Sequence, residues 1–345
     1  VDYAWSPATR GSLRMLLASD QAEITNTADT ERADVRYSNA YLWGTLEHDW
    51  SERLATTALV SFTDVGAQRE ARVFEPGQRV GFVDDERDYD VLALKLDASY
   101  ATERWLQRAG VDVRWLDATY EYASAVDFAA DYPYPGAQAQ GFTRSLAPAP
   151  AGEHIAVYYT VRGRLTDALT AELGLRWDEE TYGVDADDQL APRFNLAWRL
   201  HDSTRLLASW GRYQQYQGIE ELPVEDGVDR FAPAQSADHL ILGLEHDLAA
   251  SWSLRVEAYR KDYTDLATRY ESLYDPLSLA PELRWDRVTI TPTSALATGA
   301  EVLLTRKPVD AWSGWLGYAW SRVQDQEGGS QVRRSWDQTH TVNGG

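Results

Sequence analysis

The sequence predicts an all-β protein, an antiparallel transmembrane β-barrel of which this chain holds a part. Three observations predict it: segments with two-residue alternation, short polar turns that join pairs of these segments, and long polar connections between the pairs. Short turns at one end of the strands and long loops at the other are typical of bacterial outer-membrane barrels, where they lie on the periplasmic and extracellular sides. We therefore expect about 14 to 15 antiparallel strands in this chain.

The segment 169–177 shows the alternation most clearly. Leu173, Leu175 and Trp177 fall on one face, whereas Glu172 and Arg176 fall on the other. Successive side chains of a strand point to opposite faces, so this strand has one apolar and one charged face. An apolar face with Trp at its ends favours lipid on the outside and a polar lumen on the inside, rather than a soluble sandwich.

Short turns set the register of the hairpins, and most contain Ser, Thr, Asp or Pro, which favour tight reversals. Each is followed within a few residues by an apolar side chain such as Leu54, Trp105 or Trp252. In chain order the expected turns are 6–9, 51–53, 102–104, 166–168, 201–203, 249–251 and 308–311.

The long connections hold most of the Pro, Gly and Asp residues, and we expect them to be loops. Loops of this length are uncommon in compact domains unless they have a function. Their expected ranges are 20–38, 66–86, 118–153, 179–190, 214–235, 262–294 and 323–338.

Composition excludes several classes of protein. The chain has no Cys, which excludes disulfides and thiolate metal sites, and its 14 Trp and 19 Tyr outnumber its 7 Phe. Trp and Tyr suit a membrane–water boundary because they combine an apolar ring with a polar tip. The net charge of −21 argues against a nucleic-acid partner. No apolar run is long enough for a transmembrane helix.

Catalytic and metal-binding motifs are missing from the sequence. The six His residues show no zinc-ligand spacing, and no Gly-x-Ser-x-Gly turn or phosphate-binding loop is present. The acidic stretch 185–188 could bind a cation but lacks the Gly and distal Glu of an EF-hand loop, so we interpret it as a solvated loop tip. We expect no catalytic residues, no metal site and no cofactor.

Several motifs in the second half resemble those of TonB-dependent outer-membrane receptors. The run 190–198, LAPRFNLAW, resembles the family's strand pattern PR-x-x-L-x-Y/W. The run 234–245 is similar to P-E-x-S-x-x-Y-E-L-G-x-E, with Leu240 in place of the Tyr, and 257–266 and 297–302 resemble later strands. The resemblance is good over about 190–345 and rests on pattern alone over 1–189.

The resemblance implies a barrel of about 22 strands that is sealed by a plug domain and energised through an inner-membrane TonB complex. It implies uptake of a scarce solute such as a siderophore–iron complex, cobalamin or an oligosaccharide across the bacterial outer membrane. The plug, its TonB-contact segment and the closing strand have no counterpart in 1–345, which we expect to be one barrel domain cut from a longer protein. The expected partners are outer-membrane lipid, the solute and TonB, the last through the missing plug.

Two sets of residues are candidates for contact with a solute. Loop aromatics can stack on sugars or siderophore rings, although residues of a membrane-boundary girdle have the same appearance in sequence. These aromatics are Tyr132, Tyr134, Tyr213, Tyr216, Tyr270, Tyr274 and Trp285. Charged residues expected to face the lumen either pair with one another or contact the plug or an anionic solute. They are Arg108, Arg114, Arg162, Arg164, Glu172, Arg176, Arg199, Arg205, Arg255 and Glu257.

Two alternatives to an energised receptor remain open on the sequence. A passive porin, or another outer-membrane barrel without TonB coupling, has the same strand pattern. A β-structural protein outside the membrane could instead bind partners through its loops. An enzyme is not expected, because no His has a recognisable Ser and acid partner.

Overall fold

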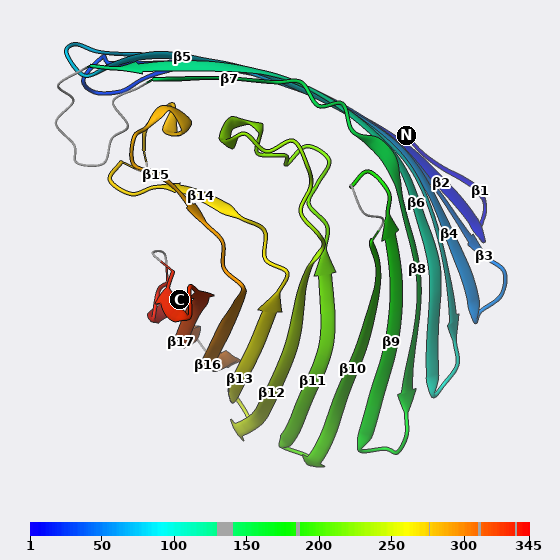
Figure 1. The fold of residues 1–345 in the computed structure, drawn as a ribbon. Helices are drawn as coiled ribbons and strands as arrows, with labels where there is room; N and C mark the ends of the chain where they lie inside the picture. The colour runs from blue at the N-terminus through cyan, green and yellow to red at the C-terminus, as the bar shows by residue number, and fades with distance from the viewer. Residues whose placement is uncertain (130–140, 184–186, 276, 310–311, 335–336) are drawn as a thin grey trace.

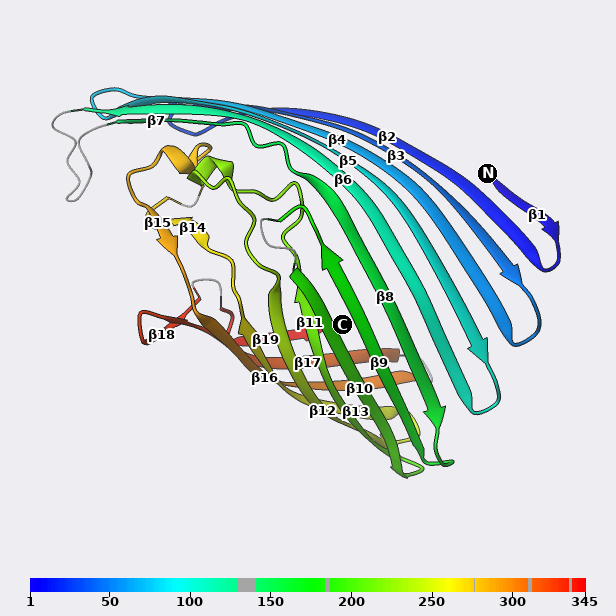
Figure 2. The same cartoon turned by 45° about the vertical axis from the view of Figure 1, so that its right-hand side comes forward.

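The computed structural model describes residues 1–129, 141–183, 187–275, 277–309, 312–334 and 337–345. Among these, 17 strands form one antiparallel sheet, and two further strands form a separate hairpin. The sheet curves into a partial barrel that is not closed (Figures 1 and 2). No helix in the described part of the chain is long and apolar enough to cross a membrane.

Almost every strand of the large sheet pairs with the next one along the chain, as in a meander. The hairpin β14–β15 lies outside this sheet, so β13 pairs directly with β16. The first half of the chain forms β1 (Asp2–Ser6), β2 (Thr9–Thr25), β3 (Glu31–Asp49), β4 (Leu54–Glu75), β5 (Arg79–Ala101), β6 (Trp105–Phe128), β7 (Phe142–Leu146), β8 (Ala151–Arg164) and β9 (Leu169–Glu180). The second half forms β10 (Asp187–His201), β11 (Thr204–Gln215), η1 (Val224–Asp226), β12 (Gln235–Ala249), β13 (Trp252–Thr264), β14 (Arg269–Ser272), η2 (Pro281–Leu283), β15 (Arg287–Ile290), β16 (Ser294–Val309), β17 (Trp312–Glu327), β18 (Ser330–Arg333) and β19 (His340–Gly344).

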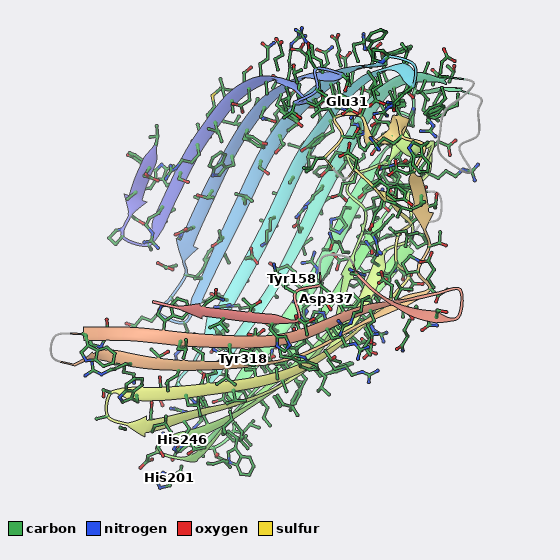
Figure 3. The ribbon with its side chains drawn as sticks, turned by 90° about the vertical axis from the view of Figure 1, so that its left-hand side faces the viewer. Glu31, Tyr158, His201, His246, Tyr318 and Asp337 are labelled. Carbon is green, nitrogen blue, oxygen red and sulfur yellow. The ribbon has the colours of Figure 1, made fainter. Side chains whose placement is uncertain are left out.

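The expected short turns are confirmed and all lie at one end of the barrel, which we call the short-turn end. Each of these connections joins two strands whose ends lie within two residues of the ends of the expected turn, for example Asp49 and Leu54 around 51–53, or Ala249 and Trp252 at 249–251. Residues 310–311 of the last turn lie outside the described part. Figure 3 shows His201 and His246 at the short-turn end and Glu31 at the opposite end, which we call the loop end.

The sheet has 17 strands rather than 14 to 15, and four of the seven expected loop ranges contain long stretches of strand: 20–38, 66–86, 118–153 and 323–338. The expected loops 214–235 and 262–294 agree closely with the observed connections between strands of the sheet. The range 66–86 is almost entirely strand, because β4 and β5 are 22 and 23 residues long and are joined only by residues 76–78. β6 likewise continues to Phe128, and the short strands β7 and β18 raise the strand count to 17. A strand needs only about 9–11 residues to cross a bilayer, so β4–β6 extend well beyond the membrane. Their polar ends toward the loop end therefore form paired strands where loops were expected.

The outward face of the sheet carries an apolar band that ends abruptly toward the loop end. Phe62, Leu92 and Trp115 are exposed members of this band on β4, β5 and β6. The next outward residues on these strands are Asp64, Asp90 and Asp117, which lie directly opposite one another. Exposed apolar side chains below a charged row are expected where a bilayer surrounds a barrel. The structure therefore agrees with lipid on this face.

The buried core lies on the concave face near the loop end, not in the middle of the barrel. Tyr120 and Val126 of β6 pack there with Val83 of β5. They contact Leu222 and Leu283, which belong to the two longest loops of the second half. Figures 1 and 2 show the long ends of β4–β6 arching over these loops.

Candidate functional site in the lumen and at its mouth

The concave face can be followed from strand to strand by register. Arg114 shares a face with the buried Tyr120 of the same strand, since the two are separated by an even number of residues. Arg108 of that face lies opposite Thr160, and Arg162 of β8 lies opposite Glu172 of β9. The register continues through Asn195, Ser209 and Ile241 to Glu257, so all ten charged residues expected in the lumen lie on the concave face.

Most of these charged side chains pair within the lumen wall. Arg162 bonds Glu172 at 2.7 Å, Arg176 bonds Asp178 at 2.7 Å, and Arg255 bonds Glu257 at 2.6 Å. The remaining pairs join Arg114 to Asp112 and Arg205 to Glu245, while Arg164 and Arg199 donate to the carbonyl oxygens of Glu103 and Asp167. The side chain of Arg108 is exposed in the lumen.

A cavity of about 620 Å³ lies on the concave face near the short-turn end. Arg162, Arg199 and Arg205 line it together with Glu172 and Glu257. Its mixture of charges and small side chains is suited to contact with a polar protein surface or solute.

Aromatic rings and cations meet on the concave face above this cavity. The ring of Tyr213 lies 4.5 Å from that of His239, and the Arg193 guanidinium lies 4.6 Å from the Tyr213 centroid. Tyr216 donates a 3.0 Å hydrogen bond to the carbonyl oxygen of Asp178, and its ring lies 5.6 Å from that of His154. The structure thus places two of the expected ligand residues, Tyr213 and Tyr216, on the same strand–loop junction of the lumen wall.

The mouth of the lumen is occupied by two segments: the first inner loop (216–234, with η1) and the second inner loop (265–293, with β14, η2 and β15). Both loops belong to the second half of the chain but pack against β3–β6 of the first half. Tyr120 of β6 donates a 2.5 Å hydrogen bond to the carbonyl oxygen of Ile219 and accepts one of 3.2 Å from the Leu222 amide. The first inner loop is therefore fixed to the opposite wall through its backbone.

Buried ion pairs fix the second inner loop in the same way. Arg69 of β4 pairs with Glu282 of η2, whose side chain is 1% exposed. Arg79 of β5 bonds the Leu283 carbonyl oxygen, and Glu31 of β3 accepts hydrogen bonds from Ser278 and the Leu279 amide. Burying charge is unfavourable unless each group is paired and hydrogen-bonded, and here each of these groups is paired.

The two inner loops are also joined to each other. Arg287 of β15 forms a bidentate pair with Asp226 of η1, at 2.9 and 2.5 Å. Arg87 of β5 bonds Glu225 at 2.7 Å and thereby ties η1 to the wall. Bidentate Arg–carboxylate pairs are among the stronger polar contacts in proteins. The loops and the wall form one connected polar network.

Burial changes the acid–base behaviour of the network. It raises the pKa of Tyr120 to about 12, and it raises the pKa of Tyr122 with a further contribution from Glu282. For Asp286, burial alone acts to raise the pKa. Hydrogen bonds from the Tyr274 amide and the Arg284 guanidinium outweigh it and hold the pKa of Asp286 below its ordinary value.

The other expected ligand aromatics belong to the second inner loop or cannot be placed. Tyr274 stacks on Trp285 with 5.4 Å between ring centroids and is 73% exposed. Tyr270 lies on β14, and burial together with the nearby Asp226 raises its pKa. Tyr132 and Tyr134 lie outside the described residues, as do residues 185 and 186 of the acidic stretch.

Sequence reasoning missed the residues that hold the mouth. Arg69, Arg79 and Arg87 fall in or beside the range 66–86, which we expected to be a loop. Once the range is known to be strand, two-residue alternation places Arg69 and Arg87 on the face of the lumen. No local signal indicates their partners, since Glu282 lies 213 residues from Arg69. Among the described side chains, no group of three or more His, Asp or Glu is arranged to hold a metal ion.

Comparison with known proteins supports this fold. The family model described as "TonB dependent receptor-like, beta-barrel" matches residues 1–344, and no curated protein matches the chain. The ferric-catecholate import receptor Fiu of E. coli K12 superposes with a TM-score of 0.64 at 11% identity, over 99% of this chain and 60% of its own. The unliganded ferric citrate transporter FecA gives 0.62 at 15% identity, over 99% and 53%.

The RagAB peptide importer in its closed-closed state is also similar, with a TM-score of 0.57 at 8% identity, over 97% of this chain and 46% of that one. The chain spans about half the length of these three structures. At such low identities these structures show a similarity of fold alone. Membership of a family rests on the family model that matches residues 1–344.

Proposed function

Since this chain belongs to the TonB-dependent receptor-like β-barrel family, we propose that it forms much of the wall of an energy-coupled outer-membrane receptor. The receptor takes up a scarce solute, which its inner loops and the aromatic part of its lumen wall bind. The family is one of receptors and transporters, and its barrels lie in the outer membrane of Gram-negative bacteria.

The observation that carries this proposal is the inward folding of the two inner loops. They lie inside the mouth and are held against β3–β6 by buried pairs such as Arg69–Glu282 and Arg79–Glu31. A passive channel needs an open path for diffusion, whereas a receptor needs an ordered surface at its mouth. A binding surface that is already ordered loses less conformational entropy when the ligand binds. This smaller entropic cost favours tight binding of a dilute solute.

The chemistry of the wall supports one class of solute. Tyr213 and Tyr216 offer ring faces, and Arg193 adds a positive charge beside Tyr213. Such a surface suits a solute that is both aromatic and anionic, as a ferric catecholate is, and the same chemistry suits a peptide with an acidic or aromatic side chain. We favour a ferric siderophore, because rings and positive charge occur together on the lumen wall.

The cavity at the short-turn end suits a plug domain. Its side chains Arg162, Arg199 and Glu257 are charged, and several of them are still partly exposed. Docking of a polar domain there can replace water around these groups with hydrogen bonds. The plug then connects the barrel to the TonB complex, which supplies the energy.

Binding and uptake by the intact protein test the proposal. We expect a ferric catecholate to bind more tightly than ferric citrate or an oligopeptide, and Tyr213→Leu to weaken that binding by about tenfold, in line with the loss of one aromatic–cation contact. Tyr159→Leu, on the outward face, is the matched control and should leave binding unchanged. Uptake that continues unchanged in cells without TonB, or a large steady conductance in planar bilayers, would identify a passive porin instead.

A further inference from the structure

The outward face of the barrel carries a hollow near the short-turn end, which we call the outer trough. It crosses β3, β4, β5, β6 and β8, with Thr9 of β2 at its edge, and has a volume of about 830 Å³. Its floor consists of Thr56, Ala98 and Ala109, which lie directly beside one another on β4, β5 and β6. Larger side chains on either side, including Leu96 and Tyr159, form its walls. The hollow lies within the apolar band, where lipid chains contact the barrel.

One end of the outer trough is polar. The Trp50 indole donates a 2.9 Å hydrogen bond to the Thr56 hydroxyl. The His48 ring lies 4.4 Å from the Trp50 ring and shares a 2.8 Å hydrogen bond with Thr9. Trp and polar side chains gather where hydrocarbon meets headgroups, so this end of the trough lies at the headgroup level.

Two short turns beside this end present both signs of charge. The turn 51–53 ends in Glu52-Arg53 and the turn 102–104 ends in Glu103-Arg104. The two turns are neighbours, since the amide of Ala101 donates a 2.8 Å hydrogen bond to the carbonyl oxygen of Arg53. All four charged residues are exposed, and none forms an ion pair with another residue in the described part of the chain.

We propose that the outer trough binds one phospholipid whose headgroup carries both a phosphate and a primary ammonium, as in phosphatidylethanolamine. An acyl chain lies in the trough, and the phosphate accepts hydrogen bonds from Arg53 and Arg104, which suit phosphate geometry. The ammonium donates to Glu52 and Glu103 through charge-assisted hydrogen bonds. This inference goes beyond solute uptake and depends only on the membrane-spanning fold.

The charge pattern distinguishes this lipid from its competitors. An anionic headgroup without an amine places negative charge beside Glu52 and Glu103, which is unfavourable. A choline headgroup has no N–H group and makes no hydrogen bond to either carboxylate. The primary ammonium of the ethanolamine headgroup is small and offers three donors. A preference for phosphatidylethanolamine over both phosphatidylglycerol and phosphatidylcholine is therefore the signature of the site.

Lipid retention by the intact protein tests the proposal. The protein, purified in detergent, is mixed with equal amounts of the three lipids and its bound lipid is measured by native mass spectrometry. We expect phosphatidylethanolamine to be retained about tenfold more than either competitor, the ratio that one charge-assisted hydrogen bond provides. The double variant Ala98→Leu/Ala109→Leu fills the floor of the trough and should abolish this retention.

Matched variants separate the trough from general effects of lipid. Ala258→Leu/Ala300→Leu changes two neighbouring outward residues of β13 and β16 that do not line the trough, and it should retain lipid like the parent. Glu52→Gln/Glu103→Gln should remove the preference for phosphatidylethanolamine over phosphatidylglycerol. Arg53→Gln/Arg104→Gln should weaken retention of both of these lipids. Equal retention of the three lipids by the parent, or equal loss in the two Ala→Leu pairs, overturns the proposal.

Discussion

Arg79 of β5 donates a 2.5 Å hydrogen bond to Glu31 of β3, and their side chains are only 1% and 3% exposed. Glu31 in turn accepts hydrogen bonds from Ser278 and Leu279, while Arg79 donates to the Leu283 carbonyl oxygen. One pair of buried charges thus joins two strands of the wall to the second inner loop. We therefore expect the order of the mouth to depend on this pair.

Arg79→Gln removes the cation from the buried carboxylate of Glu31 and from the half-buried carboxylate of Glu75. Breaking a buried ion pair in this way costs about 3–5 kcal/mol of stability. We expect the loss to be local, so that amide hydrogen exchange speeds up over residues 277–293 before the barrel unfolds. Arg72→Gln, which removes an exposed pair with Asp84, is the control and should change stability by about 0–1 kcal/mol. Equal protection of the loop in both variants would contradict the role of Arg79.

Tyr120→Phe removes the hydroxyl that holds the first inner loop. The Leu222 amide then has no acceptor and the Ile219 carbonyl oxygen loses its donor, at a cost of about 1–3 kcal/mol. Faster exchange of the Leu222 amide measures the effect. Tyr159→Phe serves as the control, because its hydroxyl bonds Gln107 on the outward face and touches neither inner loop. An unchanged Leu222 amide in Tyr120→Phe speaks against a holding role for Tyr120.

Acid should loosen the second inner loop through Asp286. The pKa of its carboxyl is lowered in the folded state, whereas an unfolded Asp titrates at about 3.9. The stabilisation is therefore fully present above about pH 3.9 and is lost as the pH falls through the lower folded pKa. The difference in Trp fluorescence between the parent and Trp285→Phe reports on the Tyr274–Trp285 stack during an acid titration. Asp286→Asn should give a loop that is looser at pH 7 and less sensitive to acid, and an unchanged acid transition would count against this assignment.

Arg substitutions at one outward and one inward position can test which face of the sheet contacts lipid. Leu173 of β9 points outward and is 56% exposed, so Leu173→Arg places a charge in lipid. Near the middle of the membrane this costs about 2–4 kcal/mol. Ser209→Arg places the same side chain on the concave face, close to Glu172 and Glu257, and should cost little. Denaturant unfolding of both variants in lipid vesicles measures the difference, and equal destabilisation would refute the facing.

The sequence determined the strands within the membrane and their faces. The alternation of Leu173 and Glu172 is a local property, since each residue of a strand points opposite to the one before it. Tight turns such as 51–53 are equally local, because the turn residues themselves favour reversal. For the same reason, alternation by itself assigns the charged residues from Arg108 to Glu257 to the face of the lumen.

Tertiary structure alone decided the mouth. Residues 66–86 carry both apolar and charged side chains on each face, for example Val83 beside Asp85 on the concave face, so alternation was too weak to distinguish strand from loop. The pairing of Arg69 with Glu282 joins residues 213 apart, and that of Tyr120 with Ile219 joins residues 99 apart. No local pattern encodes such contacts, because they exist only once the curvature of the sheet brings β3–β6 over the inner loops. The strands of the wall are determined by the local order of residues along the chain. The contacts at the mouth are determined by the curvature of the sheet that these strands form.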